Sequence, residues 1–324
     1  MSFSGPLFIV GMPRSGTKLL RGLLNRHPRI GVPGIETEFL PWLANRFERF
    51  DDLRSRARFD AFYAAMLRHS YFRYRREHGS LIEAGRWHAA CADFSAAGVF
   101  EALIRVEVDA PRGSGRIWGD KSPSYIDDLP LLKRLYPAAK VLHIVRDVRD
   151  YCLSMRNAWG KDMLRAAQRW ADGVQKARRD GAALGADYLE LRYEDLLERT
   201  ESEMRRVCAF LGVEFEPQML SLGRPAENLG DARGATRVVP GNSGKWHAMA
   251  PKTLARVEEL AGPALLACGY ALALPPRAPR RLSGAEMRLA QLGDAWRLAW
   301  GGRGGRGFWR TALFHLRYFA ATRG

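Results

Sequence analysis

A stretch near the start of the chain, LFIVGMPRSGTKLL (residues 7–20), decides the fold that the sequence predicts. Its first four residues are apolar and predict a buried strand, Leu7–Val10. Leucines then recur on one face of Thr17–Arg26, which predicts a helix. The turn between them contains two glycines, and a helix N-terminus preceded by such a turn favours a bound anion. The sequence therefore predicts a strand, a phosphate-binding loop and a helix in direct succession.

Short apolar runs alternate with longer helical stretches along the chain, a pattern typical of an α/β protein with a parallel sheet. Further strands are predicted at residues 115–119, 140–145 and 187–191. Helices are predicted at residues 59–74, 161–179, 200–212 and 251–269. We therefore expect a P-loop-type, three-layer α/β fold, in which helices flank a central parallel sheet.

The loop departs from the Walker A motif, GxxxxGK[ST], in which a lysine directly follows the second glycine. Thr17 occupies that position here, Lys18 comes one residue late, and Leu19 replaces the magnesium-binding hydroxyl. The sequence also offers no convincing Walker B strand that ends in aspartate. A nucleotide kinase or NTPase is therefore the weaker alternative, and magnesium-dependent ATP binding would identify it.

A second candidate anion-binding segment follows the predicted strand at 140–145 and reads RDVRDYCLS (residues 146–154). Arg146 stands at the strand end, and Ser154 follows across the first turns of a helix. A guanidinium fork and a serine hydroxyl at this spacing can converge on one phosphate. The alternative is an ordinary charged helix start, in which the two aspartates favour the helix dipole.

These two segments resemble the superfamily of sulfotransferases that use 3′-phosphoadenosine 5′-phosphosulfate (PAPS). PRSGT (residues 13–17) resembles their 5′-phosphosulfate loop, RDVRD with its later serine resembles their 3′-phosphate motif, and the likeness covers roughly residues 7–269. It implies transfer of a sulfuryl group from PAPS to a hydroxyl acceptor without a metal. It implies donor contacts from Arg14, Ser15, Gly16, Thr17 and Lys18 at the 5′-phosphosulfate, and from Arg146 and Ser154 at the 3′-phosphate.

Two further segments carry the catalytic candidates. GIETEFLP (residues 34–41) resembles the tyrosylprotein branch and related bacterial enzymes, and this likeness makes Glu36 the general base. Glu38 and His27 are alternative bases, although His27 is better explained by packing at a helix end. WGDKSPSY (residues 118–125) resembles the segment whose lysine faces the transferring group. Lys121 would then neutralise developing charge together with Arg14.

Two later segments resemble parts of the family that lie near the donor. LRYEDL (residues 191–196) places Tyr193 near the nucleotide by this likeness. NSGKW (residues 242–246) resembles a loop that closes over the donor, which makes Lys245 a candidate phosphate ligand and Trp246 a candidate for stacking. The structural alternative for LRYEDL is a helix N-terminus whose backbone groups are already hydrogen-bonded. The structural alternative for NSGKW is a surface loop with a packed tryptophan.

The charge balance is strongly basic, with 51 Lys and Arg against 35 Asp and Glu and a net charge of +16, which suggests anionic partners. Half of this excess lies in residues 275–324, which contain ten arginines and two acids. We therefore expect a catalytic domain at 1–274 and a basic amphipathic extension at 275–324, with helices at 285–300 and 308–321. The extension is expected to pack on the domain or in a homodimer, or to contact an anionic membrane surface. Nucleic acid is not an expected partner, because no recognisable binding module is present.

Four widely spaced cysteines form no metal-binding pattern, and no run of about 20 apolar residues predicts a membrane span. Without a signal-like N-terminus, we expect a cytoplasmic enzyme, with peripheral contact at the inner membrane surface left open. The acceptor is expected to be a small molecule, a lipid or a glycan, in a pocket shaped by residues 47–107. A non-enzymatic basic docking protein is a third alternative, disfavoured because the motif residues occur together.

Overall fold

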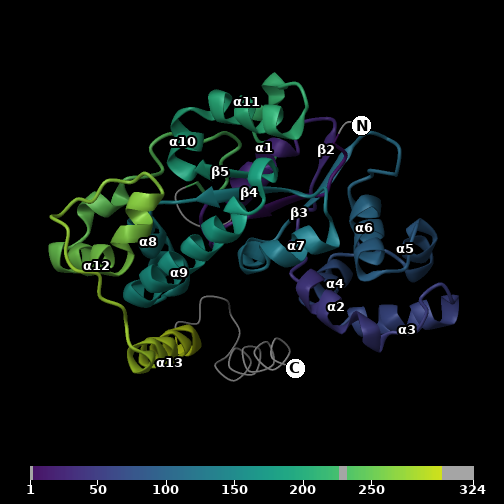
Figure 1. Ribbon diagram of the computed structural model, residues 1–324, viewed down its shortest axis with the longest axis horizontal. Helices are drawn as coiled ribbons and strands as arrows, with labels where there is room; N and C mark the ends of the chain where they lie inside the picture. The colour runs from purple at the N-terminus through teal and green to yellow at the C-terminus, as the bar shows by residue number, and fades with distance from the viewer. Residues whose placement is uncertain (1–2, 226–231, 301–324) are drawn as a thin grey trace. The chain divides into compact units, whose positions relative to one another are not determined.

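The computed structural model describes residues 3–225 and 232–300, and it confirms the α/β class. Within this part of the chain, five parallel strands form one sheet in the order β2-β3-β1-β4-β5 (Figure 1). Two strand predictions, at 7–10 and 140–145, match to the residue, and the two-residue strand β2 was not predicted. The strands are β1 (Leu7–Val10), β2 (Ile30–Gly31), β3 (Ile117–Lys121), β4 (Lys140–Val145) and β5 (Tyr188–Arg192).

Helices connect the parallel strands, as crossover connections require. The helices before the third strand are α1 (Thr17–Leu24), α2 (Leu40–Arg46), α3 (Arg56–Met66), α4 (Ser70–Glu77), α5 (Ala84–Ala90) and α6 (Ala96–Glu107). The later helices are α7 (Leu129–Leu135), α8 (Val148–Trp159), α9 (Met163–Ala182), α10 (Tyr193–Glu198), α11 (Thr200–Leu211), α12 (Pro251–Ala267) and α13 (Gly284–Trp300).

The prediction of one helix over residues 59–74 is wrong, because the chain breaks between α3 and α4. His69 has an extended backbone, with φ −73° and ψ 151°, and ends the helical path. The change of direction lets Tyr71 and Phe72 pack on Phe39, with ring centroids 5.7 and 5.4 Å away. Aromatic burial therefore outweighs the continuation of a single helix.

The sheet is covered on both faces, which produces the predicted three layers. Leu7 and Ile9 of β1 point to one face and join a buried cluster with leucines of α1 and apolar residues of α10 and α11. Phe8 points to the other face and packs on Tyr125 and Tyr136, with ring centroids 6.3 and 5.9 Å away. Because side chains alternate between the two faces of the sheet along β1, this one strand packs against both outer layers.

The chain forms two compact units, and α9 passes from one into the other. The first unit comprises residues 1–146 and 173–242 and contains the sheet. Among the described residues, the second comprises 147–172 and 243–300, and it contains α8, α12 and α13. The predicted boundary at 274/275 stays a prediction.

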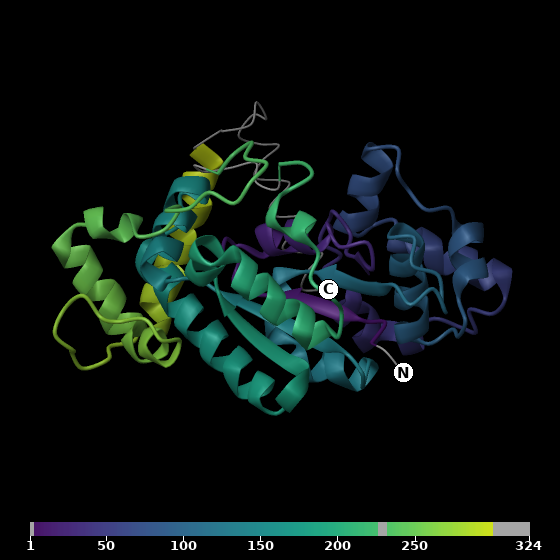
Figure 2. The ribbon, with the colours of Figure 1, turned by 90° about the horizontal axis from the view of Figure 1, so that it is seen from above.

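The first of the two predicted C-terminal helices is α13, which is anchored within the second unit by Asp294. This buried carboxylate accepts hydrogen bonds from the backbone N–H of Asp162 at 2.6 Å and from Arg165 Nη1 at 2.9 Å. Arg297 donates to the carbonyl oxygen of Gly160 at 2.7 Å, where α8 ends. Figure 2 accordingly shows α13, in yellow, beside α8. The second predicted helix, at 308–321, lies outside the described residues.

Between residues 3 and 300, apart from the gap at 226–231, no helix combines the length and apolar character that crossing a bilayer requires.

Candidate active site

The loop between β1 and α1 has the backbone conformation of an anion-binding turn. Arg14 and Gly16 adopt left-handed φ angles of 72° and 98°, and the amide of Ser15 donates to the carbonyl oxygen of Met12 at 3.1 Å. Left-handed residues in such a turn are typical of backbone nests that bind anions. The Ser15 hydroxyl is buried and has no hydrogen-bond partner among the described residues. It therefore fits a ligand oxygen as its missing partner.

Gly16 brings this loop into direct contact with the start of α10. A Cβ atom at Gly16 would lie 2.4 Å from Cδ2 of Tyr193, so only glycine permits this approach. Tyr193 is itself buried, and it follows β5 directly. The structure thus brings the predicted Tyr193 next to the phosphate loop, although the two are far apart in sequence.

Arg146 lies against the same loop. Its Nη1 atom donates to the carbonyl oxygen of Arg14 at 3.2 Å, and its guanidinium lies 4.6 Å from the ring centroid of Tyr193. Asn242, the first residue of the NSGKW segment, was not predicted as a site residue but completes the group. Its side-chain amide donates to the Tyr193 hydroxyl at 3.1 Å, and its carbonyl oxygen accepts from Arg146 Nη2 at 3.4 Å. The Nε atom of Arg146 is buried without a partner among the described residues, which again fits a ligand oxygen.

The strand order explains why these groups meet. β3, β1, β4 and β5 are neighbours and run parallel, so their carboxyl ends lie at one edge of the sheet. Lys121 is the last residue of β3. It is in register with Ile9, which lies one residue before the end of β1. Arg146 and Tyr193 follow the last residues of β4 and β5. Ligands of open α/β sheets bind at this edge.

Lys121 and Glu36 form an ion pair and a hydrogen bond at the end of β3. The Lys121 side chain is 1% exposed and the Glu36 side chain is 32% exposed. Burial lowers the pKa of the Lys121 ammonium below its ordinary value, and the Glu36 carboxylate opposes that shift. The two predicted catalytic residues therefore meet as one unit, with the carboxylate on the accessible side.

The position of Glu36 is set by buried polar contacts of the next residue, Thr37. The Thr37 backbone N–H donates to Ser122 Oγ at 3.1 Å, and its hydroxyl donates to Asp120 Oδ2 at 3.0 Å. The Tyr125 hydroxyl lies 2.7 Å from the same Thr37 oxygen. This network was not predicted from the sequence, although Asp120 and Ser122 flank Lys121 in the chain. It ties the loop that carries Glu36 to the end of β3.

Asp120 is fully buried, and burial raises its pKa to about 7, although bonds from Ser122 and Thr37 oppose the shift. Its Oδ1 atom has no hydrogen-bond partner among the described residues. Both features fit a carboxyl group that is largely protonated below neutral pH. Asp120 therefore supports the Glu36 loop without adding a full charge beside Lys121.

The two alternative bases are placed differently. Glu38 is exposed, has a left-handed φ of 56°, and donates its backbone N–H to Ser122 Oγ at 3.2 Å. His27 is buried, and both ring nitrogens are engaged: Nε2 lies 2.9 Å from the Glu214 carbonyl oxygen, and Nδ1 accepts from the Arg29 amide at 3.0 Å. His27 therefore has the packing role expected for it.

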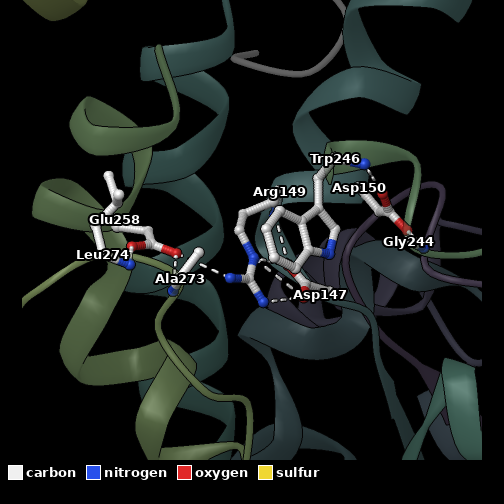
Figure 3. A network of polar contacts seen from close by, with 8 residues as sticks. All are labelled: Asp147, Arg149, Asp150, Gly244, Trp246, Glu258, Ala273 and Leu274. Atoms are coloured by element: carbon white, nitrogen blue, oxygen red, sulfur yellow. Dashed lines mark hydrogen bonds and ion pairs between the residues drawn. The ribbon is translucent and has the colours of Figure 1, made fainter. Parts of the chain in front are cut away.

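The predicted Ser154 and Lys245 belong to the second unit, on α8 and at the start of a short 3-10 helix, Lys245–Ala248. Figure 3 shows how Asp150 holds the backbone on either side of Lys245. Its carboxylate accepts from the Gly244 amide at 2.7 Å and from the Trp246 amide at 2.9 Å. The turn that presents Lys245 is thus fixed by a carboxylate of α8.

Figure 3 shows the Trp246 ring beside the Arg149 guanidinium. The guanidinium carbon lies 3.6 Å from the ring centroid. Arg149 is buried and pairs with Asp147 at 2.6 Å and with Glu258 at 2.8 Å. These contacts give Trp246 a structural partner within the second unit. Its predicted stacking on the donor stays a prediction.

Thr17 and Lys18 begin α1, with Thr17 buried and Lys18 half-buried. Lys18 also lines a cleft of about 560 Å³ in the first unit. Among the described residues, no three or more His, Cys, Asp or Glu side chains gather as a metal-binding group.

The fold and the edge site together define a P-loop-like α/β protein with a binding site for a phosphorylated ligand. The sequence matches the sulfotransferase family over residues 6–217. The chain therefore belongs to the sulfotransferase family, and it is a transferase of that class. This confirms the predicted membership of the PAPS-dependent superfamily.

Named relatives agree with this assignment. The chain is similar to protein-tyrosine sulfotransferase A of Caenorhabditis elegans, with 25% identity over 280 residues that cover 82% of this chain and 67% of the relative. It is also similar to the nodulation protein NoeE of Sinorhizobium fredii, with 28% identity over 64% of this chain and 50% of the relative. Among solved structures, the sulfotransferase domain of the Synechococcus PCC 7002 olefin synthase superposes with a TM-score of 0.56 and 23% identity, covering 85% of this chain and 98% of that domain. The structural likeness supports the fold.

Proposed function

We propose that this protein transfers a sulfuryl group from PAPS to an acceptor hydroxyl, with Glu36 as the general base. The observation that carries the proposal is the Lys121–Glu36 pair, which lies at the same sheet edge as the phosphate loop. A base and a buried cation in contact supply the two groups that the transfer needs.

The donor contacts proposed here follow the two anion-binding segments. The loop residues would bind the 5′-phosphosulfate, and the unpartnered Ser15 hydroxyl supports this. Arg146 would bind the 3′-phosphate, and its bond to the Arg14 carbonyl supports one nucleotide reaching both segments. The full set of proposed donor ligands is Arg14, Ser15, Gly16, Thr17, Lys18, Arg146, Ser154, Tyr193 and Lys245.

The proposed chemistry needs no covalent enzyme intermediate. The acceptor oxygen forms a bond to sulfur as the bond from sulfur to the bridging phosphate oxygen breaks. The acceptor proton passes to the Glu36 carboxylate, and the leaving adenosine 3′,5′-bisphosphate keeps the electron pair of the broken bond. Lys121 and Arg14 neutralise the charge that grows on the leaving group, so positioning and electrostatics provide the rate enhancement.

The acceptor is proposed to be a small molecule, a lipid or a glycan. Relatives named protein-tyrosine sulfotransferases share about a quarter of the aligned residues, so a tyrosine peptide belongs in the panel of test acceptors. A cytoplasmic location, a homodimer and a peripheral membrane contact through the C-terminal extension stay predictions.

A donor-binding experiment tests this proposal directly. Thermal unfolding is followed with adenosine 3′,5′-bisphosphate and, separately, with ATP and magnesium. We expect marked stabilisation by the bisphosphate, because a ligand that binds only the folded state raises its stability. Transfer of label from ³⁵S-PAPS to a panel of hydroxyl compounds then tests turnover. Stabilisation by ATP with magnesium alone would instead favour an NTPase.

A further inference from the structure

A concave surface of the first unit lies beside the edge strand β2 and has a volume of about 560 Å³. Residues 30–35 form one wall of this cleft, and the next residue in the chain is Glu36. Lys18, directly after the phosphate loop, also lines it. The cleft is therefore lined by one proposed donor ligand and by the residue that precedes the proposed base, so an acceptor bound in it would lie close to both.

The lining of the cleft is strongly basic. Its charged and titratable side chains are Lys18, Arg21, Tyr74, Arg75, His78, Glu107, Arg116 and Arg224. Arg75 pairs with the buried Glu107 at 3.3 Å, so that cation is already compensated. Lys18, Arg116 and Arg224 form no ion pair with any described residue. The positive charge of these three side chains in a concave surface favours an anionic ligand.

The arginines come from separate parts of the chain. Arg116 precedes β3, and its Nη1 atom donates to the backbone carbonyl oxygen of Asp109 at 3.2 Å. Because this acceptor is neutral, the charge of the Arg116 guanidinium is not compensated by this contact. Arg224 is exposed and lies beside Gly34 in the wall that leads to Glu36. Burial is the largest cause that lowers the pKa of Lys121. Glu36 opposes this shift, and the nearby charges of Arg21 and Lys18 lower the pKa further. Two cations that line the cleft are therefore close enough to act on Lys121.

We propose that this cleft binds an acidic group of the acceptor, so that the acceptor is a small hydroxyl compound with a phosphate or carboxylate. Arg116 and Arg224 recognise the acidic group while the hydroxyl lies near Glu36. The volume lies within the range of about 300–1,000 Å³ found for small-molecule sites. Tyr74 and His78, whose rings stack 3.9 Å apart, add a flat surface for the body of such a compound. This inference rests on the proposed function and narrows its acceptor.

Binding of matched phenols to the full chain saturated with adenosine 3′,5′-bisphosphate tests this inference by calorimetry. The probes are 4-hydroxyphenyl phosphate, 4-hydroxyphenylacetate and the neutral 4-methylphenol. We expect at least one acidic phenol to bind about 10-fold more tightly than the neutral one, the range for a charged hydrogen bond. The phosphate and carboxylate probes distinguish the two kinds of acidic group.

The variant Arg116→Gln/Arg224→Gln should abolish this preference, and the single variant Arg224→Gln should reduce it without disturbing an internal contact. The matched control is Arg58→Gln/Arg134→Gln, which removes two exposed arginines that do not line the cleft. Equal binding of acidic and neutral phenols overturns the inference, as does equal loss in the control. The affinity for adenosine 3′,5′-bisphosphate is measured in the same experiments. If the phenols fail the test while the bisphosphate binds normally, only the acceptor inference is wrong. If the unaltered chain does not bind the bisphosphate, the proposed function itself is contradicted.

Discussion

Arg146 donates a hydrogen bond of 3.2 Å through Nη1 to the backbone carbonyl oxygen of Arg14. The contact joins the ends of two neighbouring parallel strands, β4 and β1, which lie more than a hundred residues apart in the sequence. Arg146, the first residue of the second candidate anion-binding segment, therefore lies against the first segment, as the proposed binding of one nucleotide by both segments requires.

Replacement of Arg146 by lysine keeps the charge and removes the guanidinium fork. We expect Arg146→Lys to weaken binding of adenosine 3′,5′-bisphosphate by about 10- to 100-fold, the value of a charged bidentate contact. Calorimetric titration measures this loss. Arg134→Lys, at an exposed position on α7, is the control and should bind normally. Unchanged affinity in Arg146→Lys would exclude Arg146 as a phosphate ligand.

Glu36→Gln should abolish label transfer from ³⁵S-PAPS, because the amide cannot accept the acceptor's proton at neutral pH. Binding of adenosine 3′,5′-bisphosphate should stay within a few-fold of normal, since Glu36 is proposed to act on the acceptor and is not among the proposed donor ligands. Glu38→Gln is the matched control, because Glu38 is exposed and Lys121 forms its ion pair with Glu36. If Glu38→Gln loses turnover while Glu36→Gln keeps it, the assignment of the base is reversed.

Gly16→Ala should lower both the melting temperature and the affinity for the bisphosphate. The added Cβ would lie 2.4 Å from the Tyr193 ring, and the φ of 98° is unfavourable for alanine. Such backbone strain costs about 1–3 kcal/mol before any clash is counted. Gly113→Ala separates the two effects, because Gly113 has a φ of 82° but no atom within 4 Å of the new Cβ. Equal destabilisation in both variants would show that contact with Tyr193 contributes nothing.

Asp120 should make folding stability depend on pH. Its folded-state pKa of about 7 is raised by burial above the ordinary value of 3.8. The stabilisation is therefore complete below about pH 4 and declines as the pH rises to 7, by at most about 1.4 kcal/mol per pH unit. Denaturant unfolding of the native chain and of Asp120→Asn across this range measures the effect. The native chain should lose more stability than the variant, and identical pH profiles would contradict a protonated Asp120.

Arg149→Met should strongly destabilise the second unit. The change leaves the carboxylates of Asp147 and Glu258 buried without their shared cation. Loss of one partner of a buried ion pair costs about 3–5 kcal/mol. Thermal unfolding followed by circular dichroism measures this change. Arg156→Met, an exposed position on the same helix, should unfold near the native temperature, and similar melting of the two variants would contradict the role of this network.

Local sequence determined the phosphate loop and the two strands that flank the donor site. The apolar runs at β1 and β4 and the glycines of the first loop act through near neighbours, so their period and spacing identify them. The helical spacing of apolar residues also predicted the start of α13 to within one residue of where the structure has it. Such features need no knowledge of distant contacts.

Only the tertiary structure decided how the catalytic loop is held and what lines the cleft. The Thr37–Asp120 bond joins residues 83 positions apart. Arg116 and Arg224, which are far apart in the sequence, line the same cleft. The turn at His69 likewise depends on aromatic burial against Phe39, which outweighs local helix preference. These features arise from contacts between distant segments, whose energies no local pattern encodes.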